Sequence, residues 1–216
     1  MASVAAGSIA VVALRESAAN ETGKAEATRR AILNAAARVF RRDGYSGARL
    51  TDIAAEIGMK AGSLYYHFGS REALVEAIME DGTRRAHQAV LAATRGAPAT
   101  ADALDRLSLA IEAHLVNALA QEDIASATIK LIWQAPAPIR EKVLVAQRAY
   151  GDLWRGLLED ARAAGVLRPD VDLSVIRMAI LGALNWAADW YRPGRLEPRE
   201  VARQITTMVI GGLGAR

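Results

Sequence analysis

The sequence predicts an all-α protein, and three observations support this. Apolar residues recur three and four positions apart along most of the chain, as they do on one face of a helix. No run of useful length alternates apolar and polar residues in the way of a half-buried strand. Glycine, proline and aspartate stand where the helical patterns stop, and these residues favour helix ends and turns.

The composition excludes several classes of protein. Hydrophobic residues make up 52% of the 216 residues, so the chain can bury a sizeable core. It has no cysteine, which rules out disulfides, a thiol nucleophile and cysteine-type zinc sites. Its three histidines lack metal-ligand spacing, and no phosphate-binding loop or nucleophile elbow occurs. We therefore expect a non-enzyme without metal or cofactor.

The positive charge gathers in the first quarter of the chain. Residues 24–72 hold nine Lys and Arg against five Asp and Glu, whereas the 144 residues after them hold seventeen of each kind. One basic module beside a neutral remainder is expected when that module faces a polyanion. Residues 1–24 have an apolar run that is too short to span a bilayer and has no basic segment before it. We expect residues 1–24 to be a disordered leader.

Four helical patterns follow the leader. The first, "AEATRRAILNAAARVFRRDGY", carries one apolar stripe and stops at Gly44, a suitable C-terminal cap. A short second pattern, "RLTDIAAEIG", stops at Gly58, and "MKAGSLYYHF" then restarts a helix. The fourth and longest begins after Ser70, a good N-cap. Two short helices joined at a glycine predict a helix-turn-helix motif at about residues 49–68, whose second helix enters the DNA major groove.

The stretch "GSLYYHF" supports this interpretation. If Leu64 and Phe68, one turn apart, face a three-helix core, then the polar groups around them are directed towards solvent. Hydroxyl, imidazole and ammonium groups suit phosphate oxygens and base edges. The alternative is that the two tyrosines merely cover the core. The polar groups concerned are Lys60, Ser63, Tyr65, Tyr66 and His67.

Residues 26–75 resemble the DNA-binding domain of the TetR family of transcriptional regulators. The matching pieces are "ILNAAARVFRRDGY", "TDIAAEIG" and "GSLYYHFGSREAL", in order and at the family spacing. The resemblance implies a cytoplasmic, all-helical homodimer. Its N-terminal helix-turn-helix domain, residues 25–72, would bind a palindromic operator on double-stranded DNA. Its larger helical domain, residues 73–216, would bind a small-molecule effector and dimerise, with no role for a membrane.

Carried over by position, the resemblance implies a set of operator contacts. Arg49 stands where the family more often has a capping threonine; since arginine cannot cap in that way, we expect a phosphate contact instead. Ala61 offers only apolar contact, for instance to a thymine methyl group. Gly62 would let the backbone approach the DNA closely. The implied DNA-binding residues are Arg49, Thr51, Lys60, Ala61, Gly62, Ser63, Tyr65, Tyr66, His67 and Arg71.

The remaining chain predicts further helices near residues 100–120, 123–134, 138–164, 172–191 and 198–212. The fourth of these is apolar almost all round and the fifth has one apolar stripe, so we expect the pair to form a four-helix interface between two identical subunits. An ordinary monomer core is the alternative. The predicted interface residues are Ala179, Gly182, Ala183, Trp186, Ile205, Met208 and Val209.

Polar groups among aromatic rings mark a candidate effector pocket in the same half. Tyr150 and Trp154 stand one turn apart, as do Trp186 and Trp190, although such rings also suit a plain core. Asn185 and His114 lie in apolar surroundings and need partners if they are buried. The candidate ligand-binding residues are His114, Trp133, Arg148, Tyr150, Trp154, Asn185 and Trp186.

The segments "AAGVLRPDVD" and "NWAADWYRPG", with Tyr150 and Trp154, are similar to TetR-type regulators of fatty-acid and steroid breakdown. That resemblance implies an acyl-CoA thioester as effector, and a repressor that leaves its operator when the thioester binds. Two alternatives remain: a TetR-like regulator of multidrug efflux that responds to a lipophilic drug-like ligand, and a helical interaction protein that does not bind DNA. An activator is also compatible with the sequence.

Overall fold

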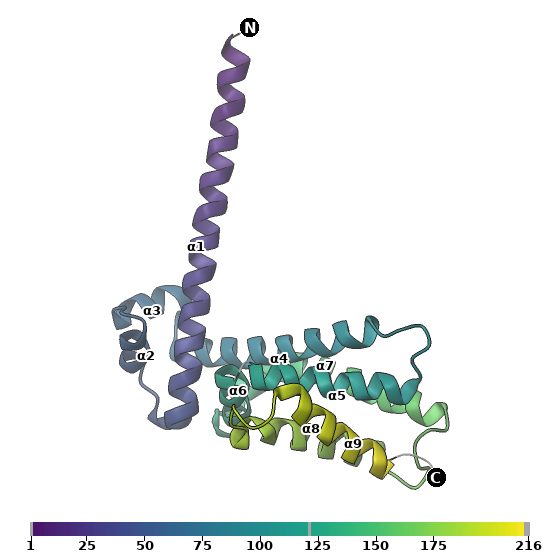
Figure 1. The fold of residues 1–216 in the computed structure, drawn as a ribbon. Helices are drawn as coiled ribbons and strands as arrows, with labels where there is room; N and C mark the ends of the chain where they lie inside the picture. Colours follow the sequence, from purple (N-terminus) through teal and green to yellow (C-terminus); the bar gives the residue numbers. More distant parts are fainter. Residues whose placement is uncertain (1, 121, 214–216) are drawn as a thin grey trace.

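The protein is all-helical in a computed structural model that describes residues 2–120 and 122–213, with side chains described for residues 23–120 and 123–212. Within these ranges no β-strand occurs, which confirms the predicted fold class. Figure 1 shows a small head, a bundle beside it and one helix that projects outward. The helices are α1 (Ala2–Gly47), α2 (Leu50–Glu56), α3 (Ala61–Phe68), α4 (Arg71–Arg95), α5 (Ala103–Ala120), α6 (Glu122–Gln134), α7 (Ala137–Ala163), α8 (Leu173–Trp190) and α9 (Pro198–Leu213).

The first helix differs from the expectation at its N-terminal end. Its backbone runs from Ala2, so most of the segment expected to be a disordered leader is drawn as the projecting part of α1 in Figure 1. This stretch is rich in alanine, the residue with the highest helix propensity. Near the other end, Gly44 has φ 69°, a left-handed conformation that favours glycine and interrupts the helix where we expected its cap.

The head is built from the C-terminal part of α1 with α2, α3 and the start of α4. The apolar stripe predicted for α1 is buried, with Ile32, Val39 and Phe40 fully inaccessible. Leu64 and Phe68 of α3 are buried against it, as predicted from their spacing. The guanidinium of Arg29 stands 4.4 Å from the centre of the Phe68 ring, a cation–π contact that covers this core.

The core of the head continues into the bundle. Ile124, Ala127 and Leu131 of α6 belong to the same buried cluster as the apolar residues of α1. Two hydrogen bonds reinforce this contact: Lys130 Nζ donates to the Arg41 carbonyl (2.7 Å) and the Tyr45 N–H donates to Gln134 Oε1 (2.8 Å). The predicted boundary at residue 72 falls inside α4, which belongs to both parts.

A second core fills the bundle formed by α4, α5, α7, α8 and α9. Its helices match the predicted ranges within a few residues, because their caps are encoded locally. Ser70 Oγ accepts from the Ala73 N–H at the start of α4, and Asp172 Oδ1 accepts from Ser174 and Val175 at the start of α8. Within the described residues no helix has the length and hydropathy required to cross a membrane.

Candidate functional site

Helices α2 and α3 form the predicted helix-turn-helix. They are joined at Gly58, whose φ of 64° allows the sharp reversal. Ile53 of α2 and Leu64 of α3 are buried in the shared core, which fixes the angle between the two helices. This packing leaves the opposite face of α3 free on the outside of the head (Figure 1).

The outer face of α3 carries the polar rings that the sequence singled out. Tyr66 is 89% exposed and Tyr65 is 53% exposed, whereas their helix neighbours Leu64 and Phe68 are buried. The His67 ring packs edge-on against Tyr66 at 5.4 Å. Exposing two phenol rings has no benefit for folding, but it presents hydrogen-bonding groups to a partner. Of the other predicted α3 contacts, Lys60 and Gly62 are exposed, and Ala61, Ser63 and His67 are partly exposed.

The start of α2 supplies two more of the predicted contacts. Arg49 and Thr51 are both exposed. Arg49 occupies the N-cap position of α2 without a side-chain cap hydrogen bond, as expected for arginine. Its guanidinium is therefore not required by the helix, and the arrangement suits a phosphate contact at a helix N-terminus.

Arg71 takes a structural position that the sequence did not predict. Its guanidinium hydrogen-bonds the Tyr45 carbonyl, lies 3.5 Å from the Ala48 carbonyl, and stacks 4.3 Å from the centre of the Tyr45 ring. It thereby ties the first turn of α4 to the end of α1 and to the connection between α1 and α2. Two other arginines of the basic module also act within the head, since Arg38 pairs with Glu56 (2.7 Å) and Arg42 with Asp43 (2.8 Å).

The bundle contains a cluster, here called the aromatic cluster, in which His114, Tyr150 and Trp154 are buried and His87 and Asn185 are half-buried. His114 Nδ1 lies 2.5 Å from the Tyr150 hydroxyl oxygen, and the two rings are stacked at 6.0 Å. The Trp154 ring packs edge-on against both, at 6.1 and 6.3 Å. His87 of α4 contacts the other side of Tyr150 at 5.7 Å. Four helices, α4, α5, α7 and α8, therefore meet at one point.

Burial decides the charge state of this cluster. It lowers the pKa of His114 to about 4, an effect that the nearby Asn185 side chain partly opposes. It also raises the pKa of Tyr150 well above its usual range. Both rings are therefore uncharged near pH 7, and their hydrogen bond joins two neutral groups.

Two polar atoms of the aromatic cluster have no hydrogen-bond partner. Trp154 Nε1 and His114 Nε2 are both buried without a partner in good hydrogen-bond geometry, although the Tyr150 hydroxyl lies near the first and the Asn185 amide near the second. A buried polar group that is left unpaired costs free energy of about 1–3 kcal/mol. Such atoms are rare in native proteins and mark places where a ligand can supply what is missing.

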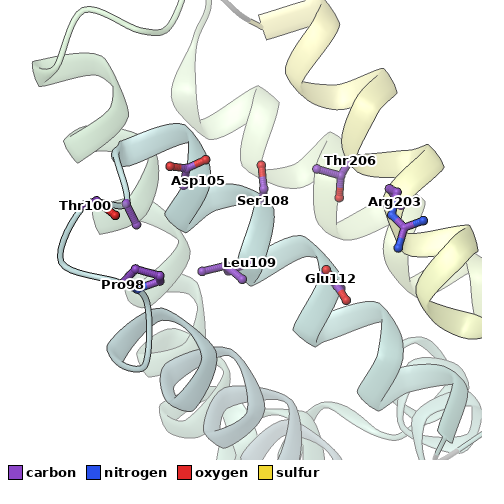
Figure 2. Close-up of a pocket in the computed structure, with 9 residues that line it drawn as sticks. Pro98, Thr100, Asp105, Ser108, Leu109, Glu112, Arg203 and Thr206 are labelled. Carbon is purple, nitrogen blue, oxygen red and sulfur yellow. The ribbon is translucent and has the colours of Figure 1, made fainter.

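Two surface cavities lie between helices of the bundle. One of about 380 Å³ is formed by the α4–α5 connection, α5 and α9; Figure 2 shows Ser108 and Glu112 of α5 facing Thr206 and Arg203 of α9. The other, of about 280 Å³, lies between α4, α6 and α7. The second cavity is lined by Met79, Ile132, Trp133, Ala137, Arg140, Glu141, Leu144 and Gln147.

The predicted ligand residues divide into two groups. His114, Tyr150, Trp154 and Asn185 come together in the aromatic cluster, although they lie on three helices. Trp133 is 77% exposed at the rim of the second cavity, and Arg148 and Trp186 point to the surface. Sequence reasoning missed His87 and Gln147, because a lone histidine or glutamine in a helix carries no spacing signal.

The last two helices expose the apolar face that was predicted for dimerisation. Trp186 is 64% exposed and Met208 65%, while Ile180 and Leu184 of α8 point into the bundle. A β-carbon added at Gly182 would meet no atom within 4 Å, so this surface is open in the single chain. Ala179 is exposed, and Ala183, Ile205 and Val209 are partly exposed. An apolar patch of this kind marks an interaction surface.

A head with a helix-turn-helix motif, joined by one long helix to a larger bundle with a buried polar cluster, defines a DNA-binding transcriptional regulator. Residues 32–78 match the family model of bacterial regulatory proteins of the tetR family, and residues 100–213 match that of the Tetracyclin repressor-like C-terminal domain. The chain belongs to the TetR family, whose regulators bind operator DNA as dimers.

Relatives match this chain over nearly its whole length. The HTH-type transcriptional repressor KstR2 of Rhodococcus jostii is 28% identical over 203 residues, which cover 91% of this chain and 96% of the relative. AibR, solved in complex with isovaleryl coenzyme A and operator DNA, is 28% identical with a TM-score of 0.70, covering 83% of this chain and 96% of that one. PfmR from Thermus thermophilus is 26% identical with a TM-score of 0.72, covering 83% and 97%.

Proposed function

We propose that this protein is a repressor that binds a palindromic operator through α3 and leaves it when a small apolar effector binds in the bundle. The observation that carries the DNA-binding half is Tyr66, 89% exposed on a helix whose opposite face is buried. The repressor function follows the relatives, since KstR2 is named a transcriptional repressor and AibR was solved with operator DNA.

The operator contacts divide into two kinds. Ser63, Tyr66 and His67 lie on the outer face of α3, where they would reach base edges and neighbouring phosphates in the major groove. Arg49, Thr51 and Lys60 stand at the N-terminal ends of α2 and α3, where helix dipoles favour phosphate. Ala61, Gly62 and Tyr65 complete the contact surface. Arg71 already bonds within the head, so we assign it to holding the head in shape beside any phosphate contact.

Dimerisation would place two heads on one operator. Two half-sites one helical turn apart lie about 34–36 Å from each other, so two copies of α3 must be held at fixed separation. The exposed apolar face of α8 and α9 is the surface for this contact. It includes Ala179, Gly182, Ala183, Trp186, Ile205, Met208 and Val209.

The effector would act through α4. Arg71 at one end of this helix belongs to the head, and His87, four turns on, packs against Tyr150 of the aromatic cluster. A ligand that rearranges the cluster would therefore shift α4 and alter the spacing of the two heads. Coupling of this kind is worth about 1–3 kcal/mol, and a complete switch needs more.

An acyl-CoA thioester is the effector class that the relatives favour. AibR was solved with isovaleryl coenzyme A, and the fatty acid metabolism regulator protein of Bacillus subtilis matches 71% of this chain at 21% identity. The apolar bundle with few polar groups suits an acyl chain. Arg148, exposed on α7, is available for a phosphate of coenzyme A.

A fluorescence-anisotropy titration tests this function. The full-length protein is titrated against the promoter DNA upstream of its own gene, with random DNA of the same length as control, and the titration is repeated with a panel of acyl-CoA thioesters. We expect selective binding that one thioester abolishes. Equal, salt-sensitive binding to both DNAs would contradict operator recognition at that promoter, and selective binding that no thioester disturbs would refute the effector class.

A further inference from the structure

The aromatic cluster contains hydrogen-bond donors in excess of acceptors. If the Tyr150 hydroxyl donates to His114 Nδ1 across their 2.5 Å contact, both groups are satisfied and the neutral ring carries its proton on Nε2. In the opposite arrangement His114 Nδ1–H donates to the phenol oxygen, and the hydroxyl hydrogen of Tyr150 then has no acceptor. In the better arrangement His114 Nε2 and Trp154 Nε1 are both N–H donors, and neither has a partner.

The three buried rings of the cluster, His114, Tyr150 and Trp154, provide no charge to balance an anion. His114 is buried and neutral, and Tyr150 and Trp154 carry no positive charge. Arg177 of α8 donates from Nη1 to the Gly151 carbonyl at 3.3 Å, one turn of α7 before Trp154; it is half-buried, and its Nε is buried without a hydrogen-bond partner. A carboxylate placed against Trp154 and His114 would lose its hydration without gaining an ion pair from these rings, whereas an uncharged carbonyl loses much less.

One face of α7 connects the second cavity with the cluster. Gln147 lines the cavity of about 280 Å³ between α4, α6 and α7, and its Nε2 atom is also buried without a partner. Tyr150 and Trp154 follow at helical spacing on the same face of α7, about 10 Å further along the axis. Two helices that border this cavity, α4 and α7, also meet at the contact between His87 and Tyr150. An elongated apolar molecule that enters at the cavity would reach the donors of the cluster.

We propose that Trp154, with His114, recognises an uncharged carbonyl oxygen on an otherwise apolar effector, and that this pair discriminates against the corresponding free carboxylate. The proposal rests on the proposed effector site and specifies the chemical group that this site recognises. Trp154 acts as the donor. Tyr150 is a positioning residue, because its hydroxyl sets which nitrogen of His114 carries the proton.

Three small aromatic probes of similar shape test this directly. Acetophenone carries a ketone, α-methylstyrene replaces the ketone oxygen with a methylene group, and benzoate replaces the methyl ketone with a carboxylate. Their dissociation constants for the full-length protein are measured by ligand-observed NMR. A net hydrogen bond corresponds to a preference of about three- to tenfold, so we expect acetophenone to bind that much more tightly than α-methylstyrene, and benzoate to bind most weakly.

The Trp154→Phe variant removes the donor and keeps an aromatic ring. We expect it to bring acetophenone and α-methylstyrene to equal affinity, whereas a purely structural loss would weaken both and keep their ratio. Trp190→Phe makes the same change at a partly exposed position of α8 and should leave the ratio as in the wild type.

Several results would overturn the proposal. In the wild type, these are equal affinities for acetophenone and α-methylstyrene, benzoate binding as tightly as acetophenone, or no binding of any probe. In Trp154→Phe, it is an unchanged ratio of the acetophenone and α-methylstyrene dissociation constants. The wild-type comparison holds even if the variant does not fold. Operator binding, measured separately by anisotropy, shows whether the regulator function stands when the proposal fails.

Discussion

Gly82 of α4 lies directly against Thr128 of α6. A β-carbon added at Gly82 would stand 3.1 Å from Thr128 Cβ and closer still to its hydroxyl oxygen, which itself bonds the Ile78 carbonyl of α4 at 3.3 Å. Only glycine lets the two helices approach so closely. Because α6 also packs on α1, this contact joins the helix that links the head to the bundle with the core of the head.

We therefore predict that Gly82→Ala destabilises the protein by about 1–3 kcal/mol, since overpacking outweighs the gain in helix propensity. Gly156→Ala is the matched control: Gly156 also lies inside a helix, but its added β-carbon would meet nothing within 4 Å. It should stabilise the protein by about 0.5–1 kcal/mol. Urea denaturation measures both, and an equal effect of the two variants would contradict the close contact.

Tyr66→Ala should weaken specific operator binding by about 1–3 kcal/mol. The side chain is 89% exposed, so the melting temperature should stay unchanged. Tyr66→Phe keeps the ring and removes the hydroxyl, and therefore separates a hydrogen bond from an apolar contact. Anisotropy titrations with operator DNA and with random DNA give the sequence-specific part of the binding free energy. If Tyr66→Ala binds the operator with unchanged affinity, Tyr66 does not belong to the interface.

Gly182→Leu should break the dimer. The side chain would project from the open, apolar face of α8, where a close helix–helix contact between subunits has no room for it. Gly156→Leu places the same side chain on α7, which is not one of the two helices of the predicted interface. Analytical ultracentrifugation measures the oligomeric state of both variants. An intact Gly182→Leu dimer would show that the subunits meet elsewhere.

The buried His114 should make stability depend on pH. Burial lowers its pKa in the folded protein to about 4, while in the unfolded chain it is about 6.5. Between these values the unfolded state binds more protons, so stability falls as the pH is lowered from about 6.5 to 4, by up to about 3 kcal/mol. In His114→Leu this contribution should be absent, although the variant is less stable overall because Tyr150 loses its partner. The free energy of unfolding is measured by urea titration at several pH values. The same dependence on pH in the wild type and in His114→Leu would refute the assignment of this effect to His114.

Local sequence determined the helices and their ends. The apolar stripe of α1, the inward pair Leu64 and Phe68, and the cap at Ser70 involve residues within one or two turns of each other. The exposure of Tyr66 follows from the same spacing, because a helix that buries Leu64 and Phe68 must turn Tyr66 outward. These features were predictable because the interactions that produce them are short in sequence.

Contacts between distant residues were decided only by tertiary packing. Arg71 meets Tyr45 across 26 positions, and His114 meets Tyr150 across 36. The sequence singled out His114, Tyr150, Trp154 and Asn185 as separate polar or aromatic residues, but held no sign that His87 joins them or that two donors remain unpaired. Periodicity tells which face of a helix is apolar, whereas the angles and distances between helices determine which side chains on those faces meet.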